Sequence, residues 1–279
     1  MRLKQLFLAG VVLAGASVVS ADPNIPSFDF ETTTGFVGSG WTCSGSAVDV
    51  NTCSLNLSNL NGNGTYDTLA WGTERNPVDS QSYLNITNIA GSIITNGGWV
   101  DTNYLDHYNH VISSAGGYMS LVSVLGLFEI VSPISLGTGF AAPVVFEETY
   151  NQNSDDCPAP NPNGSACDDI FVIPGLSASS AFYYDCDAHG CGWYVLSFRF
   201  FAGEGTTVIP NGDGTFSIYT TEACSTDGIA GCGVGEVYSP GISRLILQGR
   251  IDYVVPTPET LALLGLGLVG FALRRPRNK

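Results

Sequence analysis

The sequence predicts an all-β body, and three observations support this. Short runs of alternating apolar and polar residues recur along the chain, and Gly, Asn, Pro and Ser separate them. No part of the body has the spacing of a long amphipathic helix. Residues 193–201 (WYVLSFRFF) are rich in aromatic and β-branched side chains, which favour strands. We therefore expect a single β-sandwich domain, jelly-roll-like, with both ends of the chain outside it.

Several segments predict strands most clearly, and turn residues bound each of them. They are residues 82–89, 118–131, 142–147, 170–173, 181–184, 193–201, 215–220 and 242–254. Gly126 lies within the second segment, where it is expected to mark a bulge or bend. Residues 211–214 (NGDG) predict a hairpin turn because Asn, Asp and Gly tolerate positive φ. Residues 151–169 are rich in Asn, Asp and Pro and predict a long surface loop.

The N-terminus has the three parts of a secretory signal peptide. Arg2 and Lys4 carry positive charge, residues 6–19 are apolar, and small residues precede Asp22. We expect signal peptidase to remove residues 1–21, so that the body, residues 22–254, is exported.

The C-terminal residues 255–279 predict a sorting tail. Its apolar run, residues 260–273, is shorter than the roughly 20 residues that cross a bilayer. Positive charge behind this transmembrane segment resists translocation and holds the end in the cytoplasm. An uncut C-terminal anchor is the alternative interpretation. The residues on which this prediction depends are Pro256, Thr257, Pro258, Glu259, Arg274, Arg275 and Arg277.

The tail resembles the PEP-CTERM sorting signal of Gram-negative bacteria, which exosortase recognises. The order of motif, apolar run and arginine cluster is kept, but the sequence PTPET stands where the usual core is Pro-Glu-Pro. The resemblance implies export, processing by exosortase and a destination at the cell surface or in the extracellular matrix. Such proteins are common in bacteria that make exopolysaccharide, so polysaccharide is an expected partner in a biofilm.

The composition of the body excludes some partners. The formal net charge of the whole chain is −15, and lysine occurs only at positions 4 and 279, outside the body. Phosphate groups of nucleic acids and lipids bind mainly through Lys and Arg. We therefore expect no nucleic-acid partner, and contact with a membrane only through the C-terminal tail.

Eight cysteines lie in the body, and an even number in an exported chain predicts disulfides. They fall into close couples, so each bridge is expected to clamp the neck of one loop. The predicted pairs are Cys43–Cys53, Cys157–Cys167, Cys186–Cys191 and Cys224–Cys232. A zinc site at Cys186, His189 and Cys191 is the alternative for one couple, but an oxidising compartment favours the disulfide.

A second resemblance lies inside the body, over about residues 68–253. It rests on a series of short motifs in order. They are Trp71-Gly72, residues 96–98, the DHYN motif Asp106, His107, Tyr108 and Asn109, the strand after Tyr118, residues 146–151, residues 167–170 and residues 194–198. This order is similar to the THxN family of PEP-CTERM proteins, with Asp106 in place of the motif threonine. The resemblance implies an architecture and a destination, but no chemistry.

The two histidines at positions 107 and 110 raise a metal site as one hypothesis. On a strand they would point to opposite faces, so a shared metal requires a turn. The other hypothesis gives His107 and Asn109 hydrogen bonds to backbone that fix a loop.

Carboxylates surround the predicted loop and suggest calcium, which takes oxygen ligands. The candidate ligands are Glu147, Glu148, Asp155, Asp156, Asp168 and Asp169. A solvated acidic loop without metal is the default interpretation, with no cofactor. The leading functional hypothesis is a non-enzymatic surface or matrix protein that associates with exopolysaccharide, with no catalytic residues. A carbohydrate hydrolase with paired carboxylates and a self-associating coat protein are the alternatives.

Overall fold

The computed structural model describes residues 27–44, 53, 55–73, 81–110, 112, 117–147, 161–164, 168–175, 179–184, 192–222 and 241–254. These residues form strands and connecting turns, which confirms the all-β prediction. The strands are β1 (Ser27–Val37), β2 (Thr42–Ser44), β3 (Asn56–Leu60), β4 (Thr65–Trp71), β5 (Ser82–Asn88), β6 (Gly91–Ile94), β7 (Val100–Asn109), β8 (Tyr118–Ser132), β9 (Leu136–Glu147), β10 (Asp169–Pro174), β11 (Ser180–Tyr184), β12 (Gly192–Ala202), β13 (Thr206–Pro210), β14 (Thr215–Thr220) and β15 (Gly241–Val254).

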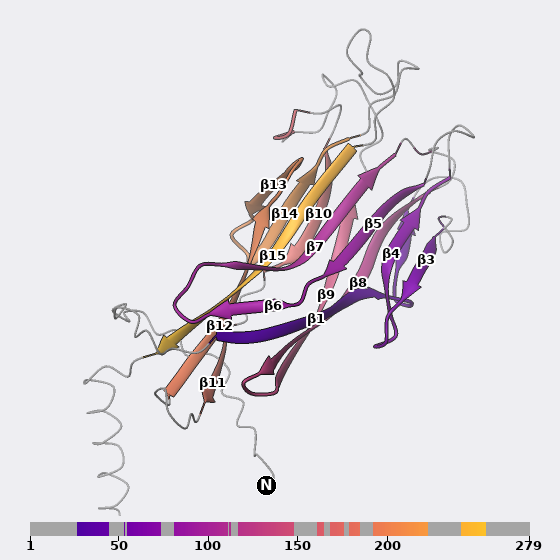
Figure 1. The fold of residues 1–279 in the computed structure, drawn as a ribbon. Helices are drawn as coiled ribbons and strands as arrows, with labels where there is room; N and C mark the ends of the chain where they lie inside the picture. Colours follow the sequence, from indigo (N-terminus) through magenta and orange to yellow (C-terminus); the bar gives the residue numbers. More distant parts are fainter. Residues whose placement is uncertain are drawn as a thin grey trace, which may run out of the picture.

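All the described strands belong to one antiparallel sheet, which curls so that its two halves face each other (Figure 1). The order along the sheet is β11-β12-β15-β7-β5-β4-β1-β8-β9-β10-β14-β13. We call the half from β11 to β4 the front layer and the half from β8 to β13 the back layer. Strand β1 joins them because it pairs with β4 on one side and with β8 on the other. The predicted sandwich is thus one continuous sheet folded over, not two separate sheets.

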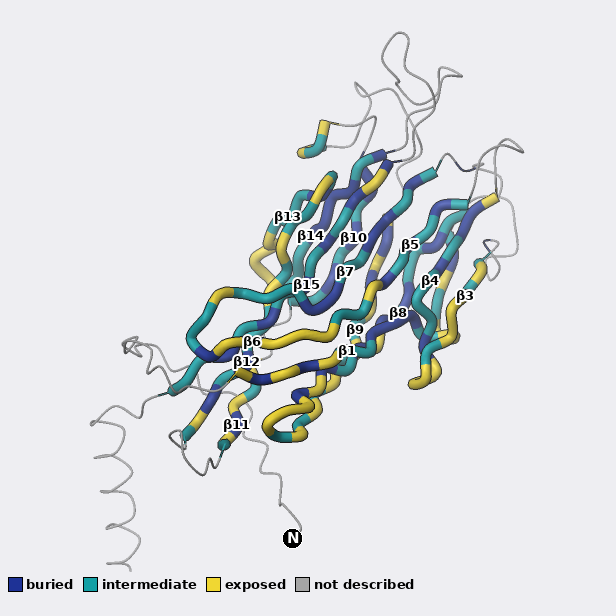
Figure 2. The backbone as a smooth tube through the Cα atoms, viewed as in Figure 1, coloured by how far each residue is buried: buried dark blue, intermediate teal, exposed yellow. Residues whose placement is uncertain are grey.

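Alternation along the strands explains why the two layers pack together. In β10 and β15 buried residues alternate with more exposed ones, so each strand has one apolar face. Figure 2 shows buried positions along the strands of both layers, and their side chains pack together between the layers. They form two clusters. The first includes Trp71, Leu84, Met119, Phe146 and Phe171, and the second includes Phe28, Phe30, Ile93, Tyr194 and Ile251.

Each strand segment predicted from the sequence is present, although some ends differ. Strand β9 begins at Leu136, earlier than the predicted residue 142. The hairpin at 211–214 is confirmed, because the backbone N–H of Asn211 donates to the Thr215 carbonyl at 3.0 Å and Gly212 and Gly214 have positive φ. Both the hydroxyl and the backbone N–H of Thr215 donate to Asp213 and hold the pKa of its carboxyl below the usual value.

Gly126 does not mark a bulge, which corrects the prediction. Strand β8 pairs in regular register through this position with both Thr34 and Phe140. A Cβ on Gly126 would lie 2.2 Å from the Phe140 ring. Glycine is therefore required here so that the Phe140 ring can lie against the backbone of β8.

Among the predicted disulfides, Cys43–Cys53 is confirmed. The other six cysteines lie outside the described residues, as do the predicted signal peptide, residues 255–279 and most of the predicted loop at 151–169. Within the described part of the chain, no helix is long and apolar enough to cross a bilayer.

Candidate functional site

The DHYN motif lies on the second half of β7, where alternation divides it between the two faces of the front layer. His107 and Asn109 point into the space between the layers and are buried. Asp106 and Tyr108 belong to the opposite, outer face. His110 follows the strand, and its ring lies near Tyr83, with centroids 6.1 Å apart. The two histidines therefore lie on opposite sides of the sheet, as the sequence predicts, and do not converge on a metal.

His107 lies in a box of aromatic rings in the first cluster. Its ring stacks on Trp71, with centroids 5.6 Å apart and planes 16° apart. The edges of Phe146 and Phe171 approach it from the back layer at 6.0 Å and 5.1 Å. His107 Nδ1 makes a 3.0 Å hydrogen bond with Thr220 Oγ1 on β14, whereas Nε2 has no partner.

Burial determines the protonation state of His107. Desolvation lowers its pKa from 6.5 to about 3, and the charge of His110 adds to this effect. A second ring proton would place an N–H⁺ group at Nε2, against apolar rings and without an acceptor. The ring is therefore neutral at physiological pH, which suits a structural role.

Asn109 forms the second link between the layers. Its Nδ2 donates to Asp169 Oδ2 on β10 at 2.6 Å, and Ser82 Oγ donates to its Oδ1 at 3.3 Å. Asp169 is completely buried. The sequence hypothesis expected His107 and Asn109 to form hydrogen bonds with the backbone of a loop. It is wrong about the partners, because both residues bind side chains of the facing layer. Together these bonds tie β7 to β10 and β14 at one end of the fold.

Some of the residues that carry the second resemblance therefore meet in space, whereas Tyr194 lies in the second cluster and Asp106 and Tyr108 lie on the outer face. Trp71, His107, Asn109, Phe146 and Asp169 come from distant parts of the chain and pack into one buried cluster. Hydrogen bonds and ring contacts engage these side chains inside the fold, and the cluster holds the two layers together.

The outer face of the front layer is different, because aromatic side chains remain accessible there. Tyr83 on β5 and Tyr108 on β7 lie opposite each other in the sheet, and their rings stack face to face, with centroids 4.4 Å apart and planes 12° apart. Tyr104 lies four residues before Tyr108 on β7. The guanidinium carbon of Arg244 lies over the Tyr104 ring, 4.5 Å from the ring centroid. Arg244 also donates two hydrogen bonds to Asp106, at 2.6 and 2.8 Å. We call these five residues the tyrosine face.

Hydrogen bonds continue from the tyrosine face across β7, β15 and β12. Tyr104 Oη donates to Asp101 Oδ2 at 3.0 Å, and Gln248 Nε2 donates to Asp101 Oδ1 at 2.8 Å. Arg199 Nε donates to Gln248 Oε1, also at 2.8 Å. The Arg199 guanidinium lies over the rings of Trp99 and Phe201, at 4.5 and 5.6 Å. This ladder holds polar and aromatic groups in fixed positions on a broad surface.

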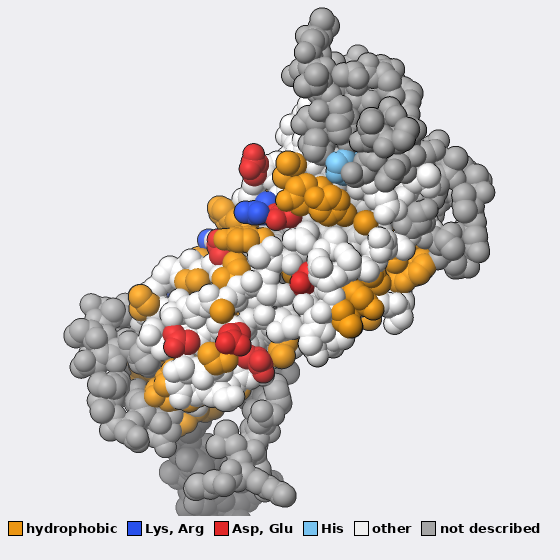
Figure 3. Space-filling view, turned by 45° about the vertical axis from the view of Figure 1, so that its right-hand side comes forward, with side chains coloured by type: hydrophobic (Ala, Val, Ile, Leu, Met, Phe, Trp, Pro, Cys, Tyr) orange, Lys and Arg blue, Asp and Glu red, His pale blue; other side chains and the backbone are white. Residues whose placement is uncertain are grey.

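The charges on this face balance locally. Every arginine of the described residues, Arg199, Arg244 and Arg250, lies here, as do Asp101, Asp106 and Asp252. Figure 3 shows hydrophobic side chains beside cationic and anionic ones over this part of the molecule. The hydrogen bond to Asp101 raises the pKa of Tyr104, and burial raises that of Tyr83. Both hydroxyls therefore stay neutral, and the face differs from the acidic remainder of the chain.

A polar recess of about 510 Å³ opens beside this face, where β1 separates from β4 and β5. The carboxamide of Asn88 closes part of the gap, because it pairs with the backbone N–H and C=O of Thr34 at 2.6 and 3.1 Å. The lining residues are Thr32, Thr33, Asn59, Asn61, Asp67, Asn85, Ile86, Thr87 and Asn88. Such amide and hydroxyl groups can both donate and accept hydrogen bonds.

The structure brings together only part of the predicted calcium set. Glu147 is exposed and lies opposite Ile170 in the sheet. Asp169, which precedes Ile170 on β10, points to the other, buried face. Asp168 accepts a hydrogen bond from the backbone N–H of Asn163 at 2.8 Å. Within the described residues, no three His, Cys, Asp or Glu side chains form a metal-binding group. Glu148, Asp155 and Asp156 lie outside the described residues, so calcium stays a prediction.

The protein is thus an all-β domain, and hydrogen bonds and ring contacts hold the aromatic and polar side chains of its outer surface in place. Comparison with known families adds the tail: residues 254–277 match the PEP-CTERM protein-sorting motif. The chain thus carries a PEP-CTERM sorting domain at its C-terminus, which indicates export and exosortase-directed sorting to the cell surface or extracellular space of a Gram-negative bacterium. No curated protein matches the chain.

Proposed function

We propose that the protein is a non-enzymatic surface protein that binds exopolysaccharide through the tyrosine face. The observation that carries this proposal is the parallel, stacked pair of half-buried rings, Tyr83 and Tyr108, on a locally neutral surface. One side of a sugar ring presents C–H groups, which pack against the negative face of an aromatic ring. The sugar hydroxyls then meet the hydrogen-bonding groups around the pair.

The polar surroundings of the tyrosines support the same proposal. Asn85 lies beside Asp106 on the neighbouring strand, and the polar recess adds further amides and hydroxyls. Asn85 accepts a hydrogen bond from Thr68 Oγ1, and Asn88 is bonded to the backbone of Thr34. Because these bonds hold the amides in place, little side-chain entropy is lost on binding.

The engagement of three buried carboxylates supports a role without catalysis. A glycoside hydrolase uses two carboxyl groups that face each other across a cleft. Here Asp106 binds Arg244, Asp168 binds the backbone of Asn163, and Asp169 binds Asn109. Release of new reducing ends from the polysaccharide by the purified protein would favour the hydrolase instead.

Calorimetry and retention on the host polysaccharide test the proposal, with and without calcium. We expect saturable binding by the natural protein and at least tenfold weaker binding by Tyr83→Ala/Tyr108→Ala. Leu125→Ala is the matched control, since Leu125 is exposed on the back layer, and it should bind normally. Absence of heat and retention under both conditions would remove the glycan proposal, and equal binding by the double variant would move the site elsewhere.

A further inference from the structure

Three side chains form a row across the ends of β11, β12 and β15. Tyr183 lies opposite Trp193 in the sheet, and Trp193 lies opposite Val254, the last residue of β15. Trp193 is 50% exposed and Tyr183 is 52% exposed, and their rings meet edge to face with centroids 5.6 Å apart. We call these three residues the terminal row. Adjacent exposed aromatic rings are typical of a surface that contacts another apolar medium.

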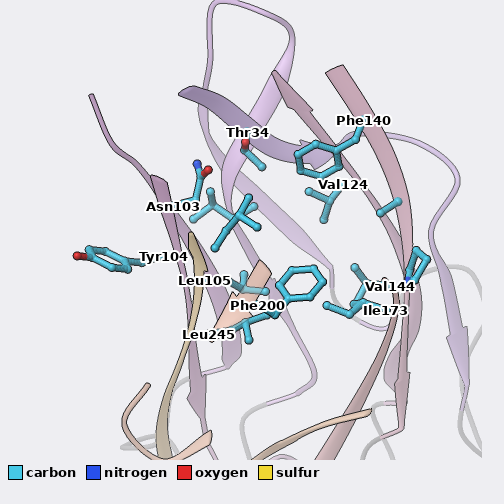
Figure 4. A pocket seen from close by; sticks show the side chains of 14 residues that line it. Thr34, Asn103, Tyr104, Leu105, Val124, Phe140, Val144, Ile173, Phe200 and Leu245 are labelled. Carbon is cyan, nitrogen blue, oxygen red and sulfur yellow. The ribbon is translucent and has the colours of Figure 1, made fainter. Parts of the chain in front are cut away.

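The terminal row lies on the outer face of the front layer and does not belong to the core. In Figure 4 Leu105 and Leu245 point into the apolar cavity of about 80 Å³ between the layers, whereas the Tyr104 ring points away from it. Ile246 lies opposite Tyr104, and Val254 follows eight residues later on the same strand, so both side chains point outward. At about 3.3 Å per residue, roughly 26 Å separates the terminal row from Tyr104 of the tyrosine face.

The terminal row carries no charge, and its surroundings offer no unpaired cation. The next row inward consists of Ala181, Val195 and Asp252. The carboxylate of Asp252 binds Arg250 at 2.6 Å. Attraction to anionic lipid headgroups requires Lys or Arg near the surface. A contact made by the terminal row is therefore apolar, and salt should not weaken it.

The sorting tail brings the terminal row close to a bilayer. The sorting motif begins at Val254, and the apolar run that is predicted to enter the bilayer starts six residues later, at Thr260. An extended chain spans at most about 3.6 Å per residue, so six residues reach about 22 Å. Trp and Tyr are enriched at the boundary between lipid and water, because their rings are apolar and each ring has one polar group.

We propose that the terminal row docks on the surface of the bilayer that holds the uncut sorting tail, with the rings of Trp193 and Tyr183 at the level of the lipid headgroups. The short connection to the tail keeps the row at a high local concentration at this surface, so weak apolar contacts are sufficient. The sequence predicts membrane contact through the tail alone. Docking of the terminal row adds a second contact, made by the folded domain itself, and fixes the orientation of the domain on the bilayer.

The test uses the full chain, reconstituted with the domain outside phosphatidylcholine vesicles, with and without lipids brominated near the headgroup end of their acyl chains. Bromine quenches tryptophan fluorescence only on close contact. The difference in emission between the natural protein and Trp193→Phe gives the emission of Trp193. We expect brominated lipid to remove most of this emission, equally at low and high salt. If brominated lipid removes the same emission from both proteins, or if the quenching of Trp193 disappears at high salt, the proposal is overturned.

Removal of Tyr183 tests whether the terminal row acts as a unit. Tyr183→Ser should lose most of the quenching of Trp193, because half of the aromatic contact is gone. Phe201→Ser is the matched control, since Phe201 is 47% exposed on the same strand and face as Trp193 but eight residues farther along β12. This control should keep the quenching of Trp193. Unchanged quenching in Tyr183→Ser, or an equal loss in both variants, contradicts docking through the terminal row.

Discussion

Trp71 and His107 stack face to face inside the fold, with ring planes 16° apart, although β4 and β7 are not neighbours in the sheet. Strand β5 lies between them. The stack therefore spans the inner surface of the front layer, and Phe146 contacts both rings from the back layer at 5.1 and 6.0 Å. Stability should depend strongly on this contact.

Truncation of His107 tests the contact directly. His107→Ala removes a buried ring and its bond to Thr220, and should lower the free energy of unfolding by about 3–5 kcal/mol, as for other buried aromatic side chains. His107→Phe keeps a ring and removes the unpaired Nε2, so it should cost less than about 1.5 kcal/mol. Denaturant unfolding measures both variants. Equal losses would show that packing of the ring is not the main contribution.

The lowered pKa of His107 predicts acid sensitivity. Between pH 6.5 and about 3 the unfolded chain binds a proton that the folded ring does not, so stability falls as pH falls through this window. The slope should reach about 1.4 kcal/mol per pH unit. Unfolding from pH 7 to 5, above most carboxyl titrations, should show this loss in the natural protein and a much smaller one in His107→Phe. Parallel profiles would assign the acid sensitivity to other groups.

The Asn109–Asp169 bond should contribute more than a typical neutral hydrogen bond, because its acceptor is a buried carboxylate. In a double-mutant cycle with Asn109→Ala and Asp169→Ala, we expect a coupling energy of about 1.5–3 kcal/mol. Ser120→Ala, at an exposed hydrogen bond to Thr42, provides a comparison and should cost little. Additive effects in the cycle would mean that the bond does not hold the layers together.

Gly126→Ala should destabilise the protein by steric overlap, since the added Cβ would lie 2.2 Å from the Phe140 ring. We expect a loss of about 1–3 kcal/mol, typical of overpacking. Gly139→Ala on β9 is the matched control, because its nearest contact would be 3.4 Å. Combination of Gly126→Ala with Phe140→Leu should recover part of the loss, and no recovery would contradict the steric explanation.

Removal of the Cys43–Cys53 disulfide should lower stability through the unfolded state. The bridge spans 10 residues, and the chain-entropy model assigns about 2–3 kcal/mol to a loop of this length. Cys43→Ser/Cys53→Ser tests this by denaturant unfolding. The natural protein under reducing conditions should lose at least this amount, because the other three predicted bridges are reduced as well, and an unchanged free energy of unfolding in the variant would contradict the prediction.

The sequence predicts the local features well because local patterns determine them. Alternation in residues 242–254 and the turn residues at 211–214 are visible without any tertiary contact. Cys43 and Cys53 are close in sequence, so their pairing could be inferred too. The sequence does not predict strand β7, because Asp101, Asn103 and Asp106 interrupt its apolar pattern.

The contacts of the candidate sites could not be predicted in the same way. Asn109 and Asp169 are 60 residues apart and meet only because the sheet curls. The pairing of Tyr83 with Tyr108 requires the register of β5 against β7, which sequence does not give. Asn103 looks like an exposed polar residue until Thr32 and Asn88 are placed around it.

The length of strand β15 determines how far one end of the fold lies from the sorting signal. The strand runs for 14 residues, from Gly241 beside Asn109 to Val254, and the sorting signal follows at once. At about 3.3 Å per residue it is a stiff rod of roughly 45 Å. The Asn109–Asp169 end of the fold therefore lies roughly 45 Å from the point where the sorting signal begins.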